Sequence, residues 1–232
     1  MQRYFASEFS NDYFKLNDDD LFHIKTVMRM KTDDMIEVVY NNELYYAIID
    51  NNFLFKLQKK GSSSVVNRHI TLVIPVLKEA KMDLILQKAT ELGASEIIPV
   101  LTERTIIKVD EKKDKKIIRW QKICKEAAEQ SKRLDIPLIL DIIDLKDLDS
   151  KDQYKIICST NEKANNIKKI LQTTNKYDKI TLVIGPEGGL SSNEEKMLEQ
   201  KGFIKASLGN LIMRVETVPI YLLSIINYAD LE

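Results

Sequence analysis

The stretch IGPEGGLSSNEE, residues 184–195, holds three of the chain's seven glycines. Glycine has no Cβ, so a glycine-rich loop lets a ligand approach the backbone closely. Ser191 and Glu194 have the spacing of a capping box, which predicts that a helix with exposed amide donors begins here. The loop has neither the Gly-Lys-Ser/Thr ending of a P-loop nor a G-x-G-x-x-G, and Glu187 would repel phosphate. It therefore predicts either a site for another kind of ligand or a tight turn without one.

A second glycine-containing turn occurs in LGNLIMRVETVPIYLLSIINY, residues 208–228. Arg214 and Glu216 stand between apolar runs, and charged side chains in that setting lie at a cleft or pair with each other. Pro219 suits the first turn of the helix that the apolar residues predict. This segment is the second candidate for a functional site.

A third candidate is KEAAEQSKR, residues 125–133, on a basic amphipathic helix predicted over Ile117–Ser131. Glu126, Gln130 and Arg133 are three or four residues apart and would share a helix face. Residues 112–133 hold nine Lys/Arg against three Asp/Glu, whereas residues 135–152 hold six Asp against two Lys. The pattern fits either an ordinary solvated helix face or a surface that meets a polyanion.

Two kinds of element must position these residues. Residues 1–66 contain short β-rich runs separated by two Asn-Asn pairs, which are typical of tight hairpins. KKGSSSVVN is the predicted linker, with a domain boundary at residue 66. From residue 67 to 232, apolar strands alternate with helices, and the glycine loop directly follows the strand ITLVI. This order predicts an α/β domain with a parallel sheet covered by helices.

The composition excludes several classes of protein. Hydrophobic residues make up 44% and charged residues 30%, with a net charge of zero, so no global charge indicates a nucleic-acid partner. The apolar runs are too short for a spanning helix and the N-terminus has no signal-peptide pattern, which predicts a cytoplasmic protein without a membrane partner. Cys124 and Cys158 are expected as buried thiols, and with two histidines they predict neither a metal cluster nor a disulfide framework.

Six ordered motifs resemble the RsmE-type 16S ribosomal RNA (uracil-N3)-methyltransferases of the SPOUT class. The resemblance runs nearly end to end, and the motifs are RYF, HIKTVMR, KMDLILQKATELGASEIIPVLTERT, RWQKICKEAAEQSKR, IGPEGGLSSNE and LGNLIMRVET. It implies a PUA-like RNA-binding β-barrel over 1–66 and a SPOUT α/β domain with a trefoil knot over 67–232. It also implies a homodimer and a 16S ribosomal RNA substrate, expected in an assembled small subunit.

The resemblance further implies that S-adenosyl-L-methionine is bound by three loops. By motif match, the cofactor-binding residues are Ser159, Thr160, Gly185, Pro186, Glu187, Gly188, Gly189, Leu208, Gly209, Leu211, Met213 and Arg214. The expected RNA-binding residues are Arg3, His23, Arg29, Arg104, Glu126, Gln130 and Arg133.

The catalytic candidates are Arg214, Arg133, Glu216 and Glu187. Uracil N3 must lose its proton before it can attack a methyl group, and an arginine beside a uracil carbonyl oxygen would stabilise the resulting negative charge. Either glutamate could accept the proton, but an unperturbed Glu, with a pKa of about 4.3, is a weak base for this step. Charge stabilisation is therefore the preferred mechanism. Two other readings stay open: methylation of another RNA nucleotide, and RNA binding without catalysis.

Overall fold

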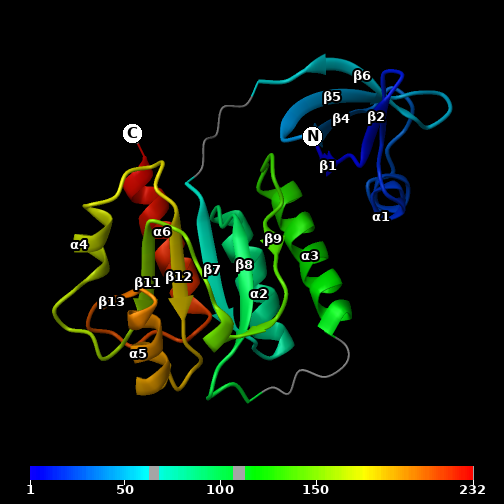
Figure 1. Cartoon of the computed structure of the whole chain (residues 1–232). Helices are drawn as coiled ribbons and strands as arrows, with labels where there is room; N and C mark the ends of the chain where they lie inside the picture. Colours follow the sequence, from blue (N-terminus) through cyan, green and yellow to red (C-terminus); the bar gives the residue numbers. More distant parts are fainter. Residues whose placement is uncertain (63–67, 107–112, 232) are drawn as a thin grey trace. The chain divides into compact units, whose positions relative to one another are not determined.

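The computed structural model describes residues 1–62, 68–106 and 113–231, and it divides into two compact units (Figure 1). The first unit comprises Met1–Val66 and Ala128–Ile136, and the second comprises Asn67–Ala127 and Pro137–Glu232. The predicted boundary at residue 66 lies outside the described residues. None of the helices formed by the described residues has the length and hydropathy that crossing a bilayer requires.

The first unit is built on a six-stranded sheet that curls into half of a barrel (Figure 1), with the strand order β1-β4-β5-β6-β3-β2. Its strands are β1 (Arg3–Phe5), β2 (Glu8–Ser10), β3 (Tyr13–Lys15), β4 (Met35–Tyr40), β5 (Glu43–Ile49) and β6 (Phe55–Lys60). Alternate residues of β4 and β5 point inward, and Ile36, Val38, Ala47 and Ile49 are fully buried in one core. The predicted barrel-like β-sheet is confirmed, and it forms half of a barrel.

The two Asn-Asn pairs form different turns. Asn41 and Asn42 both have positive φ, 51° and 60°, as a two-residue hairpin turn between β4 and β5 requires. The second pair belongs to a longer loop, in which the Asp50 carboxylate accepts hydrogen bonds from the amides of Asn52 and Leu54. The predicted hairpin between β5 and β6 is therefore confirmed, but its loop is longer than a tight two-residue turn, and the Asp50 side chain organises it.

Two short helical segments of the first unit were not predicted. Helix α1 (Asp18–Phe22) begins at Asn17, whose side chain accepts a hydrogen bond from the Asp20 amide, and it continues into a π-helical turn over His23–Val27. Both segments are shorter than the two helical turns over which an apolar repeat becomes visible in a sequence.

The second unit contains a seven-stranded sheet in which all described pairings are parallel. Its order is β10-β8-β7-β12-β11-β13, and β9 also pairs with β8. The strands are β7 (Ile70–Pro75), β8 (Glu96–Leu101), β9 (Leu138–Ile139), β10 (Ile143–Asp144), β11 (Tyr154–Cys158), β12 (Ile180–Ile184) and β13 (Ile204–Ala206). All residues of β7 and β12 are buried, as expected for central strands of a sheet covered on both faces. The predicted parallel α/β sheet is confirmed; the trefoil knot stays a prediction.

The helices that accompany this sheet are α2 (Glu79–Glu91), α3 (Lys113–Gln130), α4 (Ile167–Leu171), α5 (Ser192–Gln200) and α6 (Thr217–Asp230). Helix α5 begins with the predicted capping box, in which the Ser191 hydroxyl accepts from the Glu194 amide and the Glu194 carboxylate accepts from the Ser191 amide. Pro219 lies in the first turn of α6, as predicted. Helices α2 and α6 pack against each other (Figure 1).

Helix α3 ends earlier than the sequence predicts. Lys132 has a φ of 62°, and the Arg133 amide donates to the Ala128 carbonyl, which is the pattern of a Schellman cap. Residues 128–136 consequently belong to the first unit, although they lie far from residues 1–66 in sequence.

Candidate functional site

Three loops of the second unit start at one edge of the parallel sheet. Strands β11, β12 and β13 end at Cys158, Ile184 and Ala206, and β11 pairs in parallel with both of the others. Because the carboxyl ends of parallel strands meet at the same edge, the loops that follow them converge. This edge is where an open α/β sheet usually binds its ligand.

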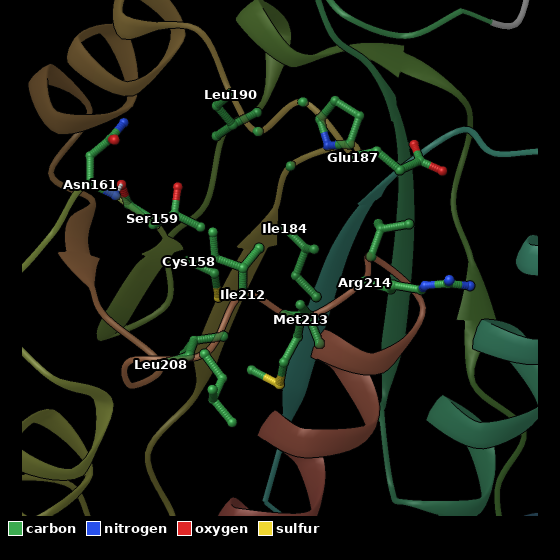
Figure 2. Close-up of a pocket in the computed structure, with 18 of the residues that line it drawn as sticks. Cys158, Ser159, Asn161, Ile184, Glu187, Leu190, Leu208, Ile212, Met213 and Arg214 are labelled. Carbon is green, nitrogen blue, oxygen red and sulfur yellow. Dashed lines mark hydrogen bonds between the residues drawn. The ribbon is translucent and has the colours of Figure 1, made fainter.

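The three loops enclose a pocket of about 720 Å³, a volume typical of small-molecule sites (Figure 2). All twelve residues predicted to hold the cofactor line it. Residues that the sequence analysis did not assign to the cofactor also line it, namely Arg104, Cys158, Asn161, Lys163, Ile184, Leu190, Glu195, Asn210, Ile212, Val215 and Val218. The structure thus brings the whole predicted set together, while the ligand itself stays a prediction.

The glycines of the pocket loops occupy their positions for different structural reasons. A Cβ on Gly185 would lie 2.8 Å from the backbone nitrogen of Leu190, so the fold of the loop requires glycine there. Gly189 and Gly209 have φ values of +70° and +116°, which L side chains rarely adopt. A Cβ on Gly188 would lie 3.2 Å from Cδ of Arg104, a flexible side chain that also donates a hydrogen bond to the Gly188 carbonyl.

One wall of the pocket contains a buried polar pair. The Ser159 hydroxyl donates to the Glu195 carboxylate at 2.7 Å and accepts from the amide of Asn161. Glu195 directly follows the capping-box glutamate of α5, and no spacing signal in the sequence connected it with Ser159. Cys158 is half-buried rather than fully buried as predicted, and burial raises the pKa of its thiol to about 12, so it remains protonated and unreactive.

Charged side chains gather at the other end of the pocket, where Figure 2 shows Glu187 and Arg214. Nζ of Lys81 lies 2.8 Å from Oε1 of Glu187 and 3.2 Å from Oε2 of Glu216. The hydrogen bond from Lys81 lowers the pKa of Glu187. A hydrogen bond from its own backbone amide, together with the Lys81 and Arg214 charges, lowers the pKa of Glu216. Both carboxylates are therefore held ionised.

Lys81 is a site residue that the sequence analysis missed. It lies in the motif KMDLILQK, which contributed to the resemblance, but it stands about a hundred residues before the glycine loop. Its place at the start of α2 connects it to two loops that follow other strands. A contact of this kind depends on the packing of α2 against the sheet, which no local pattern encodes.

Arg133 does not share a face with Glu126 and Gln130, which corrects the helix-face prediction. Helix α3 stops at Gln130, so Arg133 lies beyond the cap, 7% exposed, and its guanidinium makes a two-point ion pair with Asp135. It belongs to the first unit, whereas every residue that lines the pocket belongs to the second. The structure therefore shows a structural contact for Arg133, while its predicted roles in catalysis and RNA binding stay predictions.

Two further predicted RNA-binding residues also make internal contacts. Arg3 is 6% exposed; it pairs with Glu37 at 2.9 Å and donates to the carbonyls of Lys132 and Arg133. His23 hydrogen-bonds the Tyr4 hydroxyl through Nδ1 at 3.0 Å. These contacts hold the first unit together.

The other four predicted RNA-binding residues are exposed, which an RNA contact requires: Arg29, Arg104, Glu126 and Gln130. Within the ranges 1–62, 68–106 and 113–231, no group of three or more His, Cys, Asp or Glu side chains is placed to hold a metal ion.

The region of the chain that matches known proteins contains the pocket. The model of a family described as "RNA methyltransferase domain" matches residues 65–227, a range that contains every pocket residue. Ribosomal RNA small subunit methyltransferase E from Bacillus subtilis is 32% identical over 250 residues, covering 98% of this chain and 96% of its own length.

Two solved structures have the same fold along nearly the whole chain. Ribosomal RNA small subunit methyltransferase E from Neisseria gonorrhoeae, bound to S-adenosyl methionine, is 25% identical with a TM-score of 0.86, covering 99% of this chain and 98% of its own. A putative methyltransferase from Legionella pneumophila, in complex with SAM, is 27% identical with a TM-score of 0.86 and the same coverage.

Proposed function

The chain belongs to the RNA methyltransferase family, among relatives named ribosomal RNA small subunit methyltransferase E, and we propose that it methylates N3 of a uridine in 16S ribosomal RNA with S-adenosyl-L-methionine. The observation that carries the proposal is the pocket. Its three loops, two of which lie in separate motifs of the sequence, converge at one edge of the sheet inside the region that the family model matches.

The pocket residues fit S-adenosyl-L-methionine. Apolar side chains such as Ile184, Leu190 and Met213 suit an adenine ring, and the glycine backbone permits close approach. The ionised Glu187 disfavours a phosphate but tolerates a cationic sulfonium. When bound, the cofactor supplies an activated methyl group, so the protein mainly has to align the acceptor and exclude water.

Arg214 is the residue to which we assign stabilisation of the uracil anion. The N3 lone pair of neutral uracil is delocalised into the flanking carbonyl groups, so the site must favour loss of the N3 proton. Arg214 is exposed at the end of the pocket, where its guanidinium can hold a carbonyl oxygen as negative charge develops on it. Glu187 and Glu216 are poor general bases, because their pKa values are lowered rather than raised.

For the partners, we propose that exposed residues Arg29, Arg104, Glu126 and Gln130 contact the RNA, that the substrate is the assembled small subunit, and that the reaction takes place in the cytoplasm. A near-neutral chain suits docking on a particle through local patches better than broad attraction to free RNA.

We also propose that the enzyme is a homodimer. Tyr221 and Tyr228 of α6 are 37% and 78% exposed, and Leu211 and Ile212, which line the pocket, are 84% and 86% exposed. Large apolar side chains exposed this far indicate an interaction surface. Sedimentation at micromolar concentration should give twice the chain mass of 26.8 kDa; a monomer would contradict this proposal.

The proposed function is tested with the purified protein, labelled S-adenosyl-L-methionine, and either small subunits or free 16S ribosomal RNA from cells that lack the gene. Nucleoside mass analysis should find 3-methyluridine in the RNA of the subunits. Transfer to free RNA alone would refute the assembled substrate. A different methylated nucleoside would refute the uracil-N3 assignment, and absence of transfer with both substrates would refute the enzymatic function.

A further inference from the structure

Lys81 connects three elements that meet at the pocket. It lies in the first turn of α2, Glu187 lies in the glycine loop, and Glu216 directly precedes α6. We propose that Lys81 is a positioning residue for methyl transfer, whose ammonium group holds the glycine loop and the Arg214 loop in fixed relation through Glu187 and Glu216. This inference rests on the function proposed above, and it concerns a residue that the pocket lining does not include.

The backbone of Lys81 is well anchored. The Lys81 amide donates to the Lys78 carbonyl, and the next residue, Met82, is fully buried, as are Ile85 and Leu86 one turn further along α2. A lysine on such a helix can reach two loops while its own Cα stays in place. The helix is therefore the fixed end of the arrangement, and the two loops are the parts that Lys81 holds.

Glu216 transmits its position to Arg214 through the backbone. The amides of Thr217 and Val218 both donate to the Arg214 carbonyl, so residues 214–216 form a turn that leads directly into α6. Oε2 of Glu216 is buried and lies 3.2 Å from Nζ of Lys81 as an ion pair. A shift of Glu216 away from α2 would carry Arg214 with it.

The carboxylates of Glu187 and Glu216 both face the Lys81 ammonium group, which offsets their mutual repulsion. Glu187 faces Lys81 and Lys78, and Glu216 faces Lys81 and Arg214. Without Lys81, the two carboxylates would repel each other, and Arg214 would be the remaining close cation for Glu216. A guanidinium drawn onto Glu216 would be less available to a uracil oxygen.

The same helix offers a matched comparison. Lys88 of α2 pairs with Glu91 at 2.8 Å and is 35% exposed, against 33% for Lys81. Its partner lies one turn further along the same helix, so the pair joins no loop to the site. Lys88→Met thus removes a similar ion pair and a similar charge from the same element.

The test compares Lys81→Met, Lys81→Arg and Lys88→Met in single-turnover methyl transfer at saturating S-adenosyl-L-methionine, together with calorimetric affinity for the cofactor. Displacement of reacting groups by about 1 Å can lower a rate about 100-fold. We expect Lys81→Met to lower the transfer rate by roughly 10- to 100-fold with a smaller change in cofactor affinity. Lys81→Arg should recover most of the rate, and Lys88→Met should match the wild type.

A second arm tests the charge argument. Adding Glu187→Gln to Lys81→Met removes one of the two repelling carboxylates, so the double variant should transfer methyl groups at least as fast as Lys81→Met alone. Additive losses in the double variant, failure of Lys81→Arg to recover activity, or an equal loss in Lys88→Met would each overturn the inference. Absence of transfer by the wild type would instead refute the proposed function, so the two failures are distinct.

Discussion

Two regions were each predicted to present a set of residues that act together: the glycine loop, residues 185–189, and the segment 126–133. The structure brings the residues of the glycine loop together in one pocket, but it does not place those of the segment on one helix face. The loop is bounded by the end of a buried strand and by a capping box, which are both local features. The segment depended on a helix continuing for three more residues, and the helix stops at Gln130. Predictions tied to the edge of a sheet therefore held better than those that assumed an unbroken helix.

The largest effect should come from Arg214→Ala. We expect methyl transfer to fall about 100- to 1,000-fold, the usual cost of losing a donor to a developing oxyanion, with cofactor affinity within a few fold. Arg214→Lys should recover little, because an ammonium lacks the planar fork of donors. Transfer at alkaline pH, where uridine deprotonates by itself, should partly rescue the alanine variant. Normal transfer by Arg214→Ala at neutral pH would remove this residue from the mechanism.

Within the glycine loop, two neighbouring positions should respond differently. Gly185→Ala places a Cβ against the backbone of Leu190 and should weaken calorimetric cofactor binding roughly tenfold or more, about 1.4 kcal/mol. Gly188→Ala meets only the flexible end of Arg104 among the described residues and should bind within about threefold of the wild type. Equal binding by both variants would mean that the glycine loop does not shape the cofactor site.

In the other region, Arg133→Ala tests whether the buried arginine is structural. Its ion pair with Asp135, which is 43% exposed, predicts a loss of about 1 to 2 kcal/mol in the free energy of unfolding by urea. Transfer per folded molecule should stay within a few fold. The controls are Glu126→Ala and Gln130→Ala, which are exposed and should change stability by less than about 0.5 kcal/mol. A 100-fold loss of transfer by folded Arg133→Ala would restore its proposed role at the base.

The smallest effect concerns pH and Glu37, which joins Arg3 and Lys132 in the first unit. Burial alone would raise the pKa of Glu37, but hydrogen bonds from Lys132 and Arg3 outweigh it and lower the pKa. Its contribution to stability is therefore complete above the ordinary Glu pKa and is lost as the pH falls through the lowered value. The stability difference between wild type and Glu37→Gln, about 1 kcal/mol or less at pH 6, should shrink toward pH 3. A difference that grows on acidification would contradict this pairing.

The parts of the site that were predictable share a physical reason. Loops after parallel strands must emerge at one edge, and glycine, proline and capping residues mark two of the three loops in the sequence, whereas the full set of twelve pocket residues, Ser159 and Thr160 included, came from the resemblance to a known family. The internal contacts of Arg3 and His23 could not be predicted in this way. Their partners Glu37 and Tyr4 come from strands elsewhere in the chain, and an RNA contact of either residue stays a prediction.

The sequence by itself determined the alternation of strands and helices, the start of α5 at Ser191, and the loop residues that the sheet edge would present, because each depends on neighbours a few residues away. Only the tertiary structure decided that Lys81 would bridge Glu187 and Glu216, that Ser159 would bond Glu195, and that residues 128–136 would join the first unit. These contacts join residues that are far apart in the chain, and their distances depend on how whole elements pack.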